Sequence, residues 1–237
     1  MGTLLNRRRY MGGKPLAQMV DIEYLQSDGN QWIELGIYGS NDLDFTIDFE
    51  PTVLSDRATN WNGIGSFFGC YESSYLFVLT AYNRNTTDKG SFFFRTYGES
   101  QSATPKLGLT LTRTTITKSG DALTCPAGNL TLNRQSESFT NSVTMALFAQ
   151  KNASSNTVGR CGYMKLYSIK FEKNNETLLD LIPVRIGQVG YMYDKVSGNL
   201  MGNETSTPFT LGPDKIGGGK YLIINMLCGY SVERRAA

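Results

Sequence analysis

Three carboxylates stand at alternating positions of one short segment, and their spacing could support acid–base chemistry. Asp44, Asp48 and Glu50 lie in Leu43–Glu50, where acidic residues and a threonine alternate with Leu, Phe and Ile. In a strand this period of two places all three on one face. Retaining glycosidases need two carboxyl groups about 5–5.5 Å apart. Since the segment lacks a Glu-x-Asp-x-Glu or Glu-x-Asp-x-x-Glu order, we favour a solvated strand face over a glycosidase site.

The sequence contains no histidine, and this excludes several kinds of catalytic site at once. Ser-His-Asp and Cys-His sites and zinc sites with imidazole ligands all need that residue. Calcium stays open, because carboxylates and backbone carbonyls suffice to bind it, but the sequence has no Asp-x-Asp-x-Asp loop that would indicate it. The four cysteines form no CxxC pair, so we expect free thiols at Cys70, Cys125, Cys161 and Cys228. We therefore predict no catalytic residue, no metal site and no cofactor.

Aromatic residues beside amides form a second candidate site, for glycans. Flat rings stack on sugar faces while amides bind hydroxyl groups. Core or interface positions are the more frequent fate of such residues. The glycan-binding candidates in predicted loops and strand ends are Trp61, Asn62, Tyr71 and Tyr82.

The beginning of the chain is basic, whereas the rest is not. The whole chain has 23 basic and 21 acidic residues, a net charge of +2; four of the basic residues precede Asp21, and without them the net charge is −2. A slightly acidic body argues against nucleic-acid binding and assigns any attraction for polyanions to the first twenty residues. We expect this arm to contact a partner protein through Arg7, Arg8, Arg9 and Tyr10.

No membrane or export segment is expected. The sequence has no run of about 18 apolar residues. Tyr10–Pro15 stands where a secretion signal would need its apolar segment, so we expect synthesis in the cytoplasm.

The remaining sequence predicts an all-β fold. Leu43–Glu50 alternates cleanly, and similar apolar segments follow at short intervals between Gly, Asn, Asp and Ser residues, as in an antiparallel sandwich. Further strands are expected at Ser66–Tyr71, Tyr75–Tyr82, Ser91–Tyr97, Leu107–Arg113, Thr114–Thr117, Leu130–Leu132, Val143–Ala149, Met164–Phe171 and Leu178–Val184.

Turn residues predict the local connections at both ends of this fold. Ile22–Ile37 has the pattern of two strands around the turn Ser27–Asn30, a hairpin that opens the folded body. Asp194–Gly198 predicts another hairpin turn, between Tyr193 and Leu200. Near the end, Gly217–Gly219 is interpreted as a hinge, after which Lys220–Cys228 either adds a last strand or packs on a neighbouring subunit.

Two blocks resemble one known family. Glu23–Gly36 is similar to the start of laminin-G-like, concanavalin-A-like jelly rolls found in gut bacteria and their tailed phages, although Leu35 stands where Thr is expected. The second block resembles the final strands of the same family and comprises Lys165–Phe171, Asp180–Arg185, Gly190–Gly198 and Gly212-Pro213. The resemblance implies one jelly-roll domain over 21–213, with an N-terminal arm at 1–20 and a C-terminal extension at 214–237.

Jelly rolls of this family serve as adhesion modules, glycan binders and structural units. The arm Leu4–Met11 also resembles the short basic starts of stand-alone proteins in phages of gut Bacteroides. We therefore expect a non-enzymatic virion protein, a head-fibre, capsid-decoration or tail-fibre subunit made in the bacterial cytoplasm. Its expected partners are other virion proteins, further copies of itself, with a trimer favoured, and a host-surface glycan. The alternatives are a lectin domain and, second, a jelly-roll glycosidase.

Overall fold

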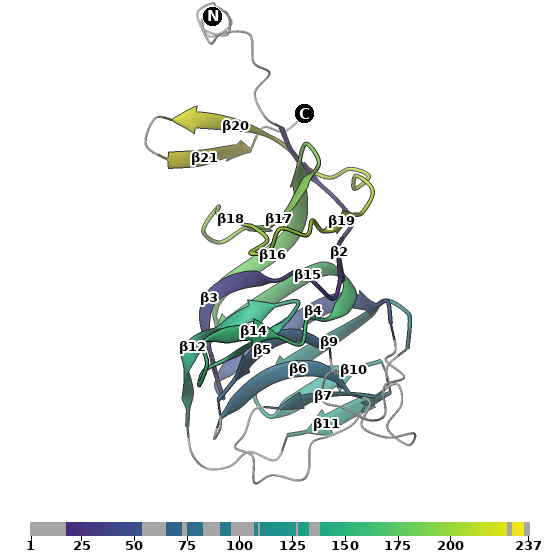
Figure 1. Ribbon diagram of the computed structural model, residues 1–237, viewed down its shortest axis with the longest axis vertical. Helices are drawn as coiled ribbons and strands as arrows, with labels where there is room; N and C mark the ends of the chain where they lie inside the picture. The colour runs from purple at the N-terminus through teal and green to yellow at the C-terminus, as the bar shows by residue number, and fades with distance from the viewer. Residues whose placement is uncertain are drawn as a thin grey trace, which may run out of the picture.

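The computed structural model describes residues 18–53, 65–72, 75–82, 91–95, 107–108, 110–126, 128–132, 138–226 and 229–234. These residues form strands and connections without any helix, and their strands build two sheets that pack face to face (Figure 1). Nearly all strand pairs are antiparallel; β13 and β5 pair in parallel. The prediction of an all-β antiparallel sandwich is thus confirmed. Within this described part, no helix is long and apolar enough to span a bilayer.

The larger sheet has thirteen strands, nine of which follow one continuous path. In spatial order these are β11 (Gly128–Thr131), β10 (Ala122–Cys125), β9 (Thr114–Ser119), β4 (Leu43–Pro51), β15 (Tyr163–Lys173), β16 (Glu176–Ile186), β1 (Gln18–Asp21), β20 (Lys220–Met226) and β21 (Gly229–Arg234). Four short strands extend it beside β15 and β16: β2 (Leu25–Asp28), β17 (Val189–Asp194), β18 (Leu200–Met201) and β19 (Thr210–Leu211).

The smaller sheet has eight strands and covers the inner face of β4 and β15. Its main path is β14 (Thr157–Gly159), β13 (Gln150–Asn152), β5 (Ser66–Tyr71), β6 (Leu76–Tyr82), β7 (Ser91–Arg95) and β8 (Leu107–Gly108). The strand β12 (Thr140–Leu147) pairs with β5 and with β3 (Ile33–Ser40).

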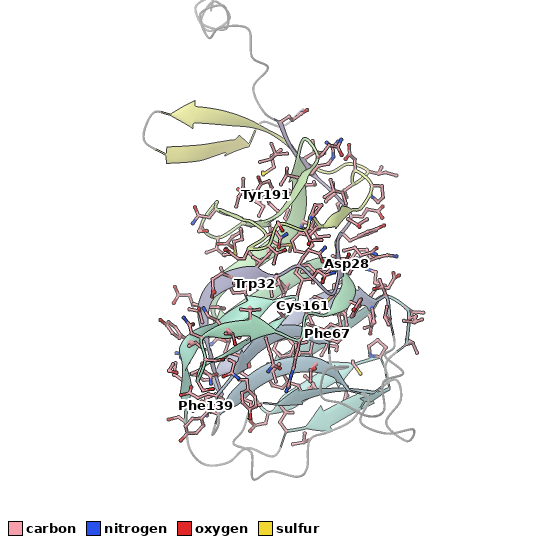
Figure 2. All side chains as sticks on the ribbon, viewed as in Figure 1. Asp28, Trp32, Phe67, Phe139, Cys161 and Tyr191 are labelled. Atoms are coloured by element: carbon pink, nitrogen blue, oxygen red, sulfur yellow. The ribbon has the colours of Figure 1, made fainter. Side chains whose placement is uncertain are left out.

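Phenylalanines of both sheets fill the space between them. In β4 the burial alternates residue by residue, as its sequence predicts, and Phe45 and Phe49 are buried. The ring centroid of Phe45 lies 4.9 Å from that of Phe68 on β5, and those of Phe49 and Phe67 lie 4.6 Å apart (Phe67 is labelled in Figure 2). Edge-on and tilted ring contacts of this kind stabilise the core beyond the contribution of the buried apolar area. The core therefore fixes the inner face of β4 and leaves its carboxylates on the outer face.

The opening segment is not a hairpin, so that prediction is wrong. Its two strands exist, but β2 pairs with β15 and β19 in the larger sheet, whereas β3 pairs with β12 in the smaller one. The turn between them crosses from one sheet to the other. The side chain of Gln31 is buried in this turn and links the end of β2 to the segment before β19. Its Oε1 accepts hydrogen bonds from Ser27 Oγ and the Asp28 N–H, and its Nε2 donates to the Pro208 carbonyl, at 2.9–3.0 Å.

A second difference concerns the strand expected at Leu107–Arg113. Only β8, residues 107–108, is a strand, and Leu111 and Thr112 form a bend. In this bend the hydroxyl groups of Thr110 and Thr112 lie 2.6 Å apart and hydrogen-bond each other. By contrast, the hairpin turn predicted after Tyr193 is confirmed, since Tyr193 pairs with Leu200.

The two chain ends are joined through β1, which pairs on one side with β16 and on the other with β20. The sheet thus continues from the sandwich into the hairpin β20–β21, which projects from the body in Figure 1. Met19 and Val184 form a small second cluster of buried residues beside β1. Of the segment Lys220–Cys228, the residues Lys220–Met226 accordingly contribute a strand, the first of the two roles considered from sequence.

Candidate functional site

The carboxylates of β4 lie in a row on the outer face of the larger sheet, and each is paired with a cation of a neighbouring strand or loop. Asp44 Oδ1 lies 2.9 Å from Lys118 Nζ, Asp48 Oδ2 lies 2.7 Å from Arg113 Nη2, and Glu50 Oε1 lies 2.7 Å from Lys165 Nζ. The sequence prediction that the three share a face is confirmed. The cations that neutralise them come from residues that sequence reasoning did not single out.

Asp48 and Arg113 form a two-point ion pair that is stacked on an aromatic ring. The Arg113 Nε donates to Asp48 Oδ1 at 2.9 Å, alongside the contact to Oδ2. The guanidinium carbon lies 3.8 Å from the ring centroid of Tyr167, in cation–π geometry. Because Arg113 keeps 56% of its side-chain surface exposed, the far side of the guanidinium plane faces solvent.

Glu50 is held as a carboxylate by two donors. Besides the contact with Lys165, the Tyr167 hydroxyl donates to Glu50 Oε2 at 3.0 Å. The hydrogen bond from Lys165 lowers the pKa of Glu50, and burial only partly offsets it. Burial and the bond to Glu50 raise the pKa of the Tyr167 phenol to about 12. At neutral pH the carboxyl is therefore ionised and the phenol is protonated.

A second tyrosine completes this surface. The ring centroids of Tyr24 and Tyr167 lie 5.6 Å apart in an edge-to-face contact, and Lys165 Nζ lies 5.1 Å over the Tyr24 ring. We call Tyr24, Asp48, Arg113, Lys165 and Tyr167, with Glu50, the tyrosine–arginine surface. Its charged groups are paired with one another, Asp48 with Arg113 and Glu50 with Lys165. The surface is therefore an ordered patch of aromatic rings and hydrogen-bonding groups on the outer face of the sheet.

The ionised state of Glu50 does not suit the role of a general acid. A glycosidase general acid needs a carboxyl group that stays protonated near neutral pH, which requires a raised pKa. The pKa of Glu50 is shifted in the opposite direction. The described residues also contain no group of three His, Cys, Asp or Glu side chains that could hold a metal ion.

Lys118 is a buried lysine near the end of β9, in the same sheet. It is 1% exposed, in phase with the core residue Ile116, and its Nζ donates to the carbonyls of Asn41 and Leu43 at 3.3 and 2.9 Å as well as to Asp44. An ammonium at such depth persists because oxygen atoms surround it. A sequence signal existed, since Lys118 falls on the apolar face of its strand.

The residues predicted to bind glycans do not come together in the described structure. Tyr71 ends β5 and is half-buried; Tyr82 ends β6, and only its backbone is described. Tyr71 pairs with Leu76 at the start of β6, so the two tyrosines lie at opposite ends of the β5–β6 pair. Trp61 and Asn62 lie outside the described residues, as do Arg7, Arg8, Arg9 and Tyr10.

The expected free thiols are observed at the three cysteines that the structure describes. Cys70 and Cys125 are buried and Cys161 is half-buried. Burial raises the pKa of the Cys70 thiol to about 12 and also raises the pKa of the Cys161 thiol. Because the thiolate is the reactive form, Cys70 is an inert core residue. Cys228 lies outside the described part of the chain.

The three glycines before β20 are a clamped turn, and the prediction of a hinge is wrong. Asp21 receives the N–H of Gly219 on its Oδ2 at 2.7 Å, its own N–H donates to the Gly219 carbonyl, and its carbonyl accepts the Lys215 N–H. A Cβ on Gly218 would lie 2.9 Å from Asp21 Cβ. The turn therefore positions β20 against β1.

A second clamp joins the same turn to β16. Arg185 Nε and Nη2 donate to the two carboxylate oxygens of Asp214 at 2.7 and 2.8 Å, and Nη1 donates to the Gly187 carbonyl at 3.1 Å. The bond to Asp214 raises the pKa of Arg185, which stays charged. At the end of the molecule where β1 pairs with β20, the side chains of Asp21 and Arg185 thus fix the turns by hydrogen bonds to Gly219, Gly187 and Asp214.

Comparison with known proteins adds no relative to this description. No family model matches the chain, and no curated protein matches it significantly.

Proposed function

We propose that this protein is a non-enzymatic structural subunit of a phage virion, of the head-fibre, capsid-decoration or tail-fibre kind, built on a laminin-G-like jelly roll. The observation that carries the proposal is the position of β1 beside the hairpin β20–β21. β1, the first described strand, lies between β16 and β20 and so joins the sandwich to this hairpin at one end of the molecule. This end of the molecule would attach to the particle, and the opposite end would face away from it.

The clamps at this end support an attachment role. Force on an anchored arm is carried into the sheet through the ladder of β1 with β16, three residue pairs long, and through the hydrogen bonds of Asp21. The basic segment Arg7–Arg9 would bind an acidic surface of a neighbouring virion protein, since guanidinium groups form two-point contacts with carboxylates. The arm would thus connect a folded body to the particle.

The pairing of the described carboxylates of β4 supports the non-enzymatic part of the proposal. Glu50, the strongest catalytic candidate on β4, is held ionised by Lys165 and Tyr167. Asp48 is bound at both oxygens by Arg113. Paired carboxylates of this kind stabilise a sheet face and leave no proton donor beside a sugar oxygen.

Removal of the arm tests the attachment. A chain that begins at Gln18 keeps β1 intact, whereas a deletion through residue 20 would also remove the buried Met19 and Val20. We expect the chain that lacks residues 1–17 to fold normally but to be depleted from purified particles at least tenfold. The triple change of Arg7, Arg8 and Arg9 to Gln should also deplete it. Lys195→Gln, a change at an exposed lysine of the folded body, should not. Undiminished incorporation of the shortened chain contradicts the proposal.

A lectin activity is the second candidate, and the tyrosine–arginine surface favours it. Sugar sites combine aromatic rings with polar groups that bind hydroxyl groups. The surface offers two tyrosine rings, a half-exposed guanidinium and two carboxylates. A glycan array with the wild type, Arg113→Ala and Trp61→Ala tests this role. Binding that only Arg113→Ala removes assigns the sugar to this surface, and binding that only Trp61→Ala removes assigns it to the loop; no binding at all rejects a lectin.

A further inference from the structure

We propose that an uncharged polysaccharide binds along strand β15, as an extended chain that contacts Tyr163 at one end and the guanidinium of Arg113, stacked on Tyr167, at the other. The inference rests on the lectin activity proposed above as the second candidate function. It adds Tyr163 as a contact residue and names the class of sugar that this sheet face would bind.

The ring of Tyr163 lies flat on the backbone of Gly29. A Cβ added to Gly29 would lie 2.4 Å from Cζ of this ring and 2.8 Å from both Cε1 and Cε2, a position above the ring plane. Gly29 has φ +90°, a conformation that glycine adopts at no steric cost. Because Tyr163 is nevertheless 44% exposed, the opposite ring face is turned to solvent and offers a stacking surface for a sugar ring.

Tyr163 and the tyrosine–arginine surface lie on the same face of the larger sheet. Tyr163, Lys165 and Tyr167 alternate with buried apolar residues of β15, so all three side chains point outwards. Four residues of a strand span about 13 Å, so Tyr163 lies too far from Tyr167, and from Arg113 stacked on it, for one sugar ring to contact both. A chain of several sugar units is needed.

Polar groups suited to hydroxyl groups lie beside this path. In the ladder between β2 and β15, Asp28, which is labelled in Figure 2, pairs with Tyr163. Gln26 pairs with Lys165 on one side and with Thr210 on the other, and directly opposite residues share a sheet face. The path thus combines a carboxylate, an amide and a hydroxyl with aromatic rings. This combination favours a sugar chain over a protein partner, whose interface would need an apolar centre.

The charges along the path favour a ligand without charge. Asp48 is paired with Arg113 and Glu50 with Lys165, at 2.7 Å in both pairs. Asp28 adds a third carboxylate against these two cations, so the path is slightly acidic. A sulfated or carboxylated chain would be repelled. The paired groups instead present fixed donors and acceptors to neutral hydroxyl groups.

Isothermal titration calorimetry of the full-length chain with neutral oligosaccharides of increasing length tests this inference. The probes are oligomers of glucose, mannose and galactose, with the sulfated chains as charged counterparts. For the neutral series that binds, we expect the affinity to rise at least tenfold between a short chain and one that spans both contacts, and the sulfated form to bind more weakly. Tyr163→Ala should remove the gain from length and leave short-chain binding unchanged, whereas Arg113→Ala should weaken both.

Tyr38→Ala is the matched control, because Tyr38 is 50% exposed on β3 of the smaller sheet. It should bind as the wild type does. Thermal unfolding identifies a variant that has lost its fold. If Tyr163→Ala does so, Gln26→Ala decides the outcome, and this variant too should weaken binding of the long chain alone.

Three results would overturn the inference and leave a lectin at Arg113 in place: equal affinity for short and long chains, unchanged long-chain binding by Tyr163→Ala, or tighter binding of the sulfated forms. Absence of binding to every neutral chain would overturn the inference together with the lectin activity. Both outcomes are separate from failure of the virion proposal, which is measured by particle incorporation of the chain without its arm.

Discussion

Replacement of the buried Lys118 by methionine should destabilise the fold strongly. Methionine fills the volume of the lysine stem but removes the ammonium that donates to the Asn41 and Leu43 carbonyls and to Asp44. Each buried carbonyl that loses its donor costs about 1–3 kcal/mol. Asp44 is 34% exposed, so water replaces part of its lost partner. We expect a loss of about 3 kcal/mol, at the lower end of the cost of a broken buried ion pair.

The assay is urea unfolding followed by circular dichroism at pH 7, with Lys170→Met as the control. Lys170 carries the same side chain on the same sheet, but its pair with Glu172 is exposed, at 39% and 36%. The control should change the free energy of unfolding by less than about 0.5 kcal/mol. For a chain of this size, Lys118→Met should lower Tm by about 6–12 °C. Equal stability of the two variants would refute the structural role assigned to Lys118.

Three further predictions concern single residues. Gly69→Ala should prevent soluble expression, because Gly69 has φ +140° and a Cβ there would lie 2.3 Å from the Phe77 carbonyl oxygen; Gly159→Ala, with open space around it, should express normally. Burial raises the pKa of Asp194, but donors from Asp180, Val196 and Ser197 outweigh it and lower the pKa below its usual 3.8. The stability this carboxylate contributes is present above pH 4 and is lost as pH falls through the lowered pKa; Asp194→Asn should therefore flatten the decline of the urea midpoint between pH 4 and 2, and an unchanged slope would reject this assignment. Cys70 should resist a thiol reagent at pH 8 in the native protein and react after unfolding, as peptide mapping can measure; rapid labelling of the folded chain would contradict its burial.

The sequence predicts the existence of several strands correctly. β4 follows from its period of two. β5 has the predicted bounds, Ser66–Tyr71, although its burial does not alternate; here the apolar run between turn residues was sufficient. Pairing could not be read in the same way. Asp28-Gly29 favours a tight turn. A turn does not determine whether the strands on either side pair with each other or join different sheets. Here β2 pairs with β15 and β3 pairs with β12, far away in the sequence.

The candidate site was predicted only in part. Alternation placed the β4 carboxylates on one face, yet the cations that neutralise them come from positions 65 to 115 residues away along the chain, as with Arg113 for Asp48 and Lys165 for Glu50. No local pattern contains such pairs. The glycine run before β20 predicts a hinge, because glycine is conformationally permissive. Its clamp depends on Asp21, which is 198 residues away from Gly219.

Quantitative mass spectrometry of purified particles tests the central claim most directly. Particles separated on a density gradient should contain the full-length chain at a constant number of copies relative to the capsid protein, and this ratio should persist through washing at moderate salt. A chain that remains in the soluble fraction of the lysate, with none in the particle peak, would contradict the assignment as a virion subunit.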